Sequence, residues 1–119
     1  MGRKILLDRN LSGFAVLQPL LVAFGYEVET LADPDASVVP PVEGVAAIII
    51  PMAGSGGWAA EVVNRFRQAG YQGIIGVAGI YTPEIDARCR LAEKNASFIP
   101  AMSGPIDTAM RIRRLLPPA

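Results

Sequence analysis

V-A-A-I-I-I, residues Val45 to Ile50, is a continuously apolar segment near the middle of the chain. A strand with one face in water alternates apolar and polar residues, whereas a strand covered on both faces is apolar throughout. Pro51 follows and ends the segment, because proline has no backbone N–H to continue the ladder. The segment therefore predicts a central strand of a parallel sheet that is covered by helices on both faces.

Strand-like and helix-like segments alternate on either side of this strand. Short apolar or alternating runs predict strands, and apolar residues three or four positions apart predict helices. We expect strands at 4–7, 26–31, 45–50, 74–78 and 97–101, and helices at 11–24, 58–69, 82–94 and 105–116. Residues 33–44 are expected to form a short stub or an irregular connection, because Pro40 and Pro41 end any helix that begins there. Strict alternation predicts one α/β domain, residues 1–119, built on a doubly wound five-stranded parallel sheet.

The composition argues against several classes of function. The 119 residues include 11 Lys+Arg and 11 Asp+Glu, so the formal net charge is zero. A dedicated nucleic-acid binder usually carries a basic excess, so we expect no nucleic-acid partner. The chain has no histidine, the usual general base and metal ligand, and Cys89 is its single cysteine. We therefore expect no metal site.

The apolar runs are too short to cross a membrane. Residues 44–53 form a mostly apolar stretch, but a spanning helix needs roughly 20 apolar residues. The first residues carry Arg3 and Lys4 but lead directly into Asp8, without the long apolar region of a signal peptide. We expect no membrane partner, and the simplest location is the cytoplasm.

Residues that follow the predicted strands are the first candidates for a functional site. In open parallel sheets, ligands bind at the carboxyl ends of the strands, near the point where strand order reverses. Here these residues are Asp8, Arg9, Pro51, Met52, Ala78, Gly79, Ala101 and Met102. They include one carboxylate and one guanidinium, and they offer no arranged acid, base or nucleophile. We therefore expect no enzymatic activity and no cofactor.

The same segments carry a family resemblance over essentially the whole chain. In order they read K-I-L-L-D-R at 4–9, F-G-Y-E-V-E-T-L at 24–31, A-A-I-I-I-P-M at 46–52, G-I-I-G-V-A-G at 73–79, T-P-E at 82–84, A-S-F-I-P-A at 96–101 and R-I-R-R-L-L at 111–116. In element order and spacing the chain resembles a response-regulator receiver domain. The resemblance implies a flavodoxin-like fold with strand order 2-1-3-4-5 and helices on both faces.

The positions that carry phosphorylation chemistry in that family are largely replaced. Asp8 matches the first member of the acid pair that holds Mg²⁺, but Arg9 stands at the second. Pro51 stands at the phosphoacceptor aspartate, Ala78 at the hydroxyl residue and Ala101 at the lysine. Proline offers no oxygen nucleophile, and alanine offers neither a hydroxyl nor an ammonium. The resemblance therefore implies a degenerate, non-phosphorylatable member, a pseudo-receiver, which acts through protein contacts.

A partner surface is expected on the last helix–strand–helix face, which resembles the output and dimer surface of the family. Arginine is enriched at protein interfaces and buries its apolar stem there. Phe98 also matches an aromatic position of the family. The candidate contacts, for a protein partner or for self-association, are Ile85, Arg88, Cys89, Phe98, Met102, Ile106, Arg111 and Arg114.

Two alternatives remain open from the residues alone. Asp8 and Arg9 belong either to a solvated loop or to a structural ion pair at the pocket. The Gly54–Gly57 loop, which precedes a helix, is either a plain flexible turn or a cradle for phosphate, since glycines let backbone N–H groups approach an anion. In the second case the chain would be a small-molecule or phosphate-binding domain of flavodoxin-like shape.

Overall fold

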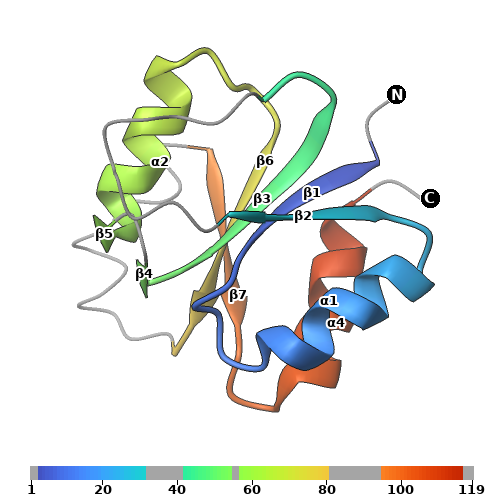
Figure 1. Cartoon of the computed structure of the whole chain (residues 1–119). Coiled ribbons are helices and arrows are strands. Elements are labelled where there is room, and N and C mark those ends of the chain that lie inside the picture. The colour runs from blue at the N-terminus through green and yellow to red at the C-terminus, as the bar shows by residue number, and fades with distance from the viewer. Residues whose placement is uncertain (1–2, 32–41, 55–56, 81–94, 117–119) are drawn as a thin grey trace.

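A five-stranded parallel sheet forms the centre of the computed structural model, which describes residues 3–31, 42–54, 57–80 and 95–116 (Figure 1). Its strands are β1 (Lys4–Asp8), β2 (Glu27–Leu31), β3 (Val45–Pro51), β6 (Ile74–Gly79) and β7 (Ala96–Pro100). They lie in the order β2-β1-β3-β6-β7. Counted along the chain within this sheet, that is the predicted order 2-1-3-4-5, and every neighbouring pair is parallel. The chain thus has the flavodoxin-like, doubly wound receiver fold.

Helices cover both faces of the sheet, as the alternation predicts. Helices α1 (Phe14–Ala23) and α4 (Pro105–Leu115) lie side by side on one face, and α2 (Ala59–Gln68) lies on the other (Figure 1). The helix predicted at 82–94 lies entirely outside the described residues. The irregular connection predicted at 33–44 lies outside them for most of its length. Neither prediction is tested there.

The central strand β3 shows why its sequence is continuously apolar. Ile48 and Ile50 belong to the core cluster beneath α2, which also contains Val63 and Phe66. Ala47 and Ile49 belong to the cluster beneath α1 and α4. Successive side chains of a strand point to opposite faces, so a strand between two helical layers buries side chains on both faces, as five of the seven residues of β3 show.

Helix α1 begins at Phe14, three positions later than the spacing of apolar residues predicts. Gly13 precedes it with φ 75°, in the left-handed region that glycine adopts without strain. A Cβ on Gly13 would lie only 2.5 Å from Cβ of Pro105, the first residue of α4. The glycine therefore lets the two helices begin in direct contact, and Leu11 packs into the core from the preceding turn.

Arg67 and Tyr71 tie together the chain around the amino ends of the strands. The Arg67 guanidinium donates to the carbonyls of Tyr71, Gly73 and Asn95 at 2.8 to 2.9 Å. The buried Tyr71 hydroxyl donates toward the carbonyls of Val45 and Ile74, at 3.3 and 3.2 Å. These contacts join α2 to β3, β6 and the start of β7.

Candidate functional site

A pocket of about 370 Å³ opens at the carboxyl ends of the strands. Pro51, Ala78 and Ala101, which stand at the phosphorylation positions of the resembled family, all line it. The remaining lining residues are Asn10, Leu11, Ser12, Leu17, Met52, Ala53, Gly79, Ile80 and Thr108. The edge of the sheet therefore brings together three of the five candidate positions, and their side chains make the pocket mainly apolar.

Asp8, the retained carboxylate, lies outside the pocket lining. Its side chain is only 3% exposed, and its Oδ1 accepts a hydrogen bond from the Asn10 N–H at 2.8 Å. Its backbone carbonyl accepts the Leu11 N–H at 3.1 Å. Arg9 is exposed to solvent. Asp8 is thus not part of a solvated loop; its carboxylate helps to fix the turn that leads from β1 toward α1.

The pocket presents hydrogen-bonding groups but no ionisable side chain among the described residues that line it. Within the described ranges, no three His, Cys, Asp or Glu side chains come together in a way that could hold a metal ion. The polar side chains of the lining are those of Asn10, Ser12 and Thr108. Such a lining can accept or donate hydrogen bonds, but it offers neither a carboxylate to a phosphoryl group nor an ammonium to neutralise one.

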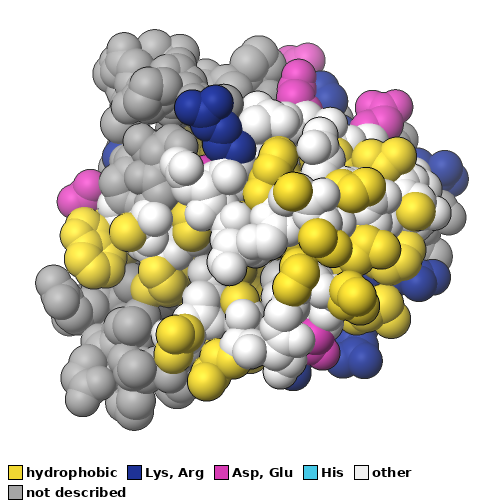
Figure 2. Space-filling view, turned by 60° about the horizontal axis from the view of Figure 1, so that its bottom comes forward, with side chains coloured by type: hydrophobic (Ala, Val, Ile, Leu, Met, Phe, Trp, Pro, Cys, Tyr) yellow, Lys and Arg dark blue, Asp and Glu magenta, His cyan; other side chains and the backbone are white. Residues whose placement is uncertain are grey.

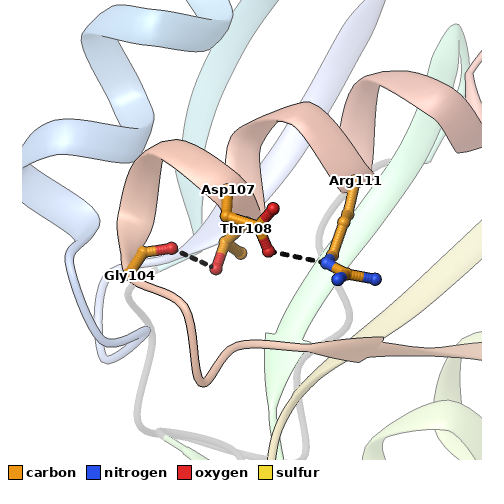
Figure 3. Close-up of polar contacts among 4 residues, drawn as sticks. All are labelled: Gly104, Asp107, Thr108 and Arg111. Atoms are coloured by element: carbon orange, nitrogen blue, oxygen red, sulfur yellow. Dashed lines mark hydrogen bonds and ion pairs between the residues drawn. The ribbon is translucent and has the colours of Figure 1, made fainter.

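Thr108 of α4 is a pocket residue that the sequence reasoning missed. It is 2% exposed, and its hydroxyl donates to the Gly104 carbonyl at 2.9 Å (Figure 3). Helical spacing contains the signal, because Thr108 lies four residues before Ile112, on the buried side of the helix. A polar residue on the buried side of a helix end that borders the strand ends is a candidate lining residue.

The described residues of the Gly54–Gly57 loop belong to a short strand pair, and both alternatives for the loop, a plain turn or a phosphate cradle, stay predictions. Strands β4 (Ala53–Gly54) and β5 (Gly57–Trp58) form an antiparallel pair. Helix α2 consequently begins at Ala59, one residue later than predicted. The Ala59 N–H donates to the Met52 carbonyl at 2.8 Å, so this N–H of the first turn is already bound within the chain.

The candidate interface residues separate into two groups. Phe98, Arg111 and Arg114 line a small depression of about 190 Å³ beside β7. Nε of Arg111 also lies 2.7 Å from Oδ2 of Asp107, one helical turn away (Figure 3). Ile106, which is 66% exposed, lies on a different side of α4 from Arg111. Met102, 72% exposed, precedes α4, whereas Ile85, Arg88 and Cys89 lie outside the described residues.

An apolar surface over α1 and α4 is a second feature that the sequence reasoning missed. Its members are exposed apolar residues: Ala15, Val16, Pro19, Val22 and Ala23 of α1, and Ile106 and Met110 of α4. Hydrophobic side chains gather on the right of Figure 2, the side on which both helices lie in Figure 1. We call these seven residues the α1–α4 surface.

Two observations place the α4 members of this surface next to α1. The Arg113 guanidinium lies over the Phe24 ring, 4.6 Å from its centroid, so this side of α4 borders α1. Helical periodicity places Ile106 and Met110 near Arg113. The signal in the sequence is that α1 is apolar around its whole circumference except at Gln18. A helix of that kind needs cover on more than one side.

None of the described helices is long and apolar enough to span a bilayer.

Comparison with known proteins supports the fold and adds no closely related sequence. No protein-family profile matches the chain, and no curated protein sequence matches it. The chemotaxis response regulator CheY4 of Vibrio cholerae is similar in structure, with a TM-score of 0.71 at 21% identity, covering 98% of this chain and all of that one. A response-regulator receiver domain from Bermanella marisrubri gives 0.70 at 15% identity, covering 97% and 98%. NtrX from Brucella abortus gives 0.73 at 14% identity, and this chain spans 27% of its length.

Proposed function

We propose that this chain is a pseudo-receiver: a signalling or scaffold module that works through protein contacts and does not accept a phosphoryl group. The observation that carries the proposal is the pocket at the strand ends. It occupies the place where a receiver fold holds its phosphorylation site, yet Pro51, Ala78 and Ala101 line it. A receiver domain needs a carboxylate to accept the phosphoryl group and cations around the phosphoryl oxygens, and the described lining residues supply neither a carboxylate nor a basic side chain. On this proposal the chain is a cytoplasmic protein without enzymatic activity.

The test of the lost chemistry is incubation with acetyl phosphate and Mg²⁺, followed by intact-mass spectrometry. A phosphorylatable receiver domain treated in parallel is the positive control. We expect no mass increase for this chain under conditions that modify the control. A stable phosphoryl adduct on any carboxylate would contradict the proposal. Beryllofluoride, a mimic of the phosphoryl group, provides a second test with Mg²⁺. Specific chemical-shift changes around Pro51 and Ala101 on its addition would also contradict the proposal.

Protein contact is proposed at two neighbouring regions. One is the last helix–strand–helix face, to which Phe98, Arg111 and Arg114 contribute. The other is the α1–α4 surface. Contiguous exposed apolar side chains of this kind mark interaction sites in soluble domains. The partner is a second copy of the chain or a different signalling protein, and the experiment below distinguishes the two.

Charge insertion tests which region binds. Val16→Glu places a carboxylate in the α1–α4 surface, and Arg111→Glu reverses a charge on the last helix–strand–helix face. Asn64→Glu, at an exposed position of α2, is the matched control. Sedimentation equilibrium measures self-association, and pull-down from the native cell compares partners retained by each variant. Loss of binding in Val16→Glu or Arg111→Glu, but not in Asn64→Glu, supports the proposal. Unchanged self-association and partner retention in both would contradict it.

A further inference from the structure

The pocket at the strand ends has the size of a small-molecule site. Ligand sites in proteins are typically clefts of roughly 300 to 1,000 Å³, and this one measures about 370 Å³. It lies near the lower end of this range and therefore suits a small ligand.

The walls of the pocket are held in place by the fold. The Ala101 N–H donates to the Gly79 carbonyl at 3.0 Å, which joins the chain just after β7 to the end of β6. Met52 packs against Gly79, where a Cβ would lie 2.7 Å from the Met52 Cγ. Methionine is unbranched and adapts its shape to neighbouring groups. The pocket thus combines a fixed floor with one adaptable wall.

The electrostatics of the pocket disfavour a charged ligand. An anion would find no lysine or arginine among the described lining residues. A cation or anion would also lose its hydration on entering an apolar pocket without a partner, at considerable cost. An uncharged ligand avoids both penalties.

Thr108 supplies one point of polar recognition. Its hydroxyl proton is committed to the Gly104 carbonyl, but a hydroxyl oxygen has two lone pairs that can accept hydrogen bonds. An O–H or N–H group on the ligand can therefore bind to this oxygen.

We infer that the pocket binds a small, uncharged and largely apolar molecule that carries one hydrogen-bond donor. This inference does not depend on the proposed signalling role, because it rests only on the volume, lining and hydrogen bonds of the pocket. If both hold, such a ligand would occupy the place that a phosphoryl group occupies in an active receiver.

The test uses four probes of similar size with the full chain: phenol, toluene, benzoate and inorganic phosphate. Titrations are followed by amide chemical shifts in two-dimensional NMR spectra. We expect phenol to bind with millimolar affinity and to shift the amides of Ala78, Gly79, Ala101 and Thr108. Toluene should bind to the same residues about five-fold more weakly, the worth of one hydrogen bond. Benzoate and phosphate should leave these amides unchanged. Absence of pocket shifts with phenol, or stronger binding of either anion, would overturn the inference.

Two variants separate pocket binding from non-specific partition. Ala101→Leu adds side-chain volume inside the pocket and should abolish the phenol shifts, whereas Ala23→Leu, on the exposed side of α1, should leave them intact. If Ala101→Leu does not fold, Ala53→Leu fills the rim of the same pocket from an exposed position. Thr108→Val should erase the preference for phenol over toluene while toluene still binds. Phenol binding that survives every filling variant that folds would refute the site.

Discussion

Tyr71→Phe removes a buried hydroxyl from the amino-terminal edge of the sheet and leaves the ring in place. The ring packs edge-on against Phe66, with centroids 6.4 Å apart, and it is 5% exposed. Burial raises the pKa of Tyr71 from 10.0 to about 12, and the positive charge of Arg67 nearby works in the lowering direction. The folded chain therefore holds the phenolic proton more tightly than the unfolded chain does.

The sign and size of the effect on stability follow from this pKa. A raised pKa contributes stability that is complete below pH 10 and is lost as the pH rises toward 12. One unit of pKa corresponds to about 1.4 kcal/mol, so the wild type should lose about 1.4 kcal/mol by pH 11 through this group alone. The full two-unit shift corresponds to about 2.7 kcal/mol, which is reached only above pH 12. Tyr71→Phe has no phenolic proton and should escape this loss.

Urea unfolding between pH 8 and pH 11 measures the difference between wild type and Tyr71→Phe. At pH 8 the variant should be about 1 kcal/mol less stable, because the single hydroxyl proton, which lies between two carbonyl acceptors, loses its hydrogen bonding. By pH 11 the two stabilities should be nearly equal or reversed. Other alkaline effects are common to both proteins and cancel in the difference. Stability curves that stay parallel across this range would show that the hydroxyl titrates alike in the folded and unfolded chain, and would refute the argument.

Further predictions concern other contacts that position the helices. Gly13→Ala should destabilise the chain by about 3 kcal/mol in urea unfolding, because it combines a positive φ with a Cβ 2.5 Å from Pro105. Gly70→Ala, at φ 95° with no atom within 4 Å of the added Cβ, should lose only about 1 kcal/mol; equal losses would show that the contact with Pro105 is unimportant. Arg67→Lys should lose about 2 kcal/mol, since an ammonium cannot serve three carbonyls at the positions that the guanidinium reaches, and an unchanged midpoint would count against that view.

Much of the architecture was predictable because it depends on local patterns. Burial explains the apolar run of β3 and the exposed Glu27 and Glu29 of the edge strand β2. Backbone chemistry explains why helices and strands end at proline and glycine. Each of these signals lies within a few residues of sequence. The starts of α1 and α2 were predicted less accurately, whereas α4 begins at Pro105 as predicted. The start of α1 depends on a contact between Gly13 and α4, far along the chain, and the start of α2 depends on pairing between β4 and β5.

The candidate site was also predictable only in part. Its location was predictable, because the carboxyl ends of parallel strands meet at one edge of the sheet. The chemistry of Pro51, Ala78 and Ala101 is equally a property of the residues themselves. That Asp8 is buried with a backbone partner while Arg9 is exposed required the structure, because it depends on the turn after β1, which brings the Asn10 N–H to the Asp8 carboxylate.

Residue types alone establish that no nucleophile, hydroxyl or ammonium stands at the expected phosphorylation positions, and that the alternating pattern forms a parallel sheet with two helical layers. Tertiary packing is responsible for the rest: an apolar pocket that includes Thr108, and an exposed apolar surface shared by α1 and α4. Both features join residues separated by most of the chain. Local periodicity can show that a side chain leaves its helix on the apolar side, but only packing decides whether that side meets the core, a cavity or solvent.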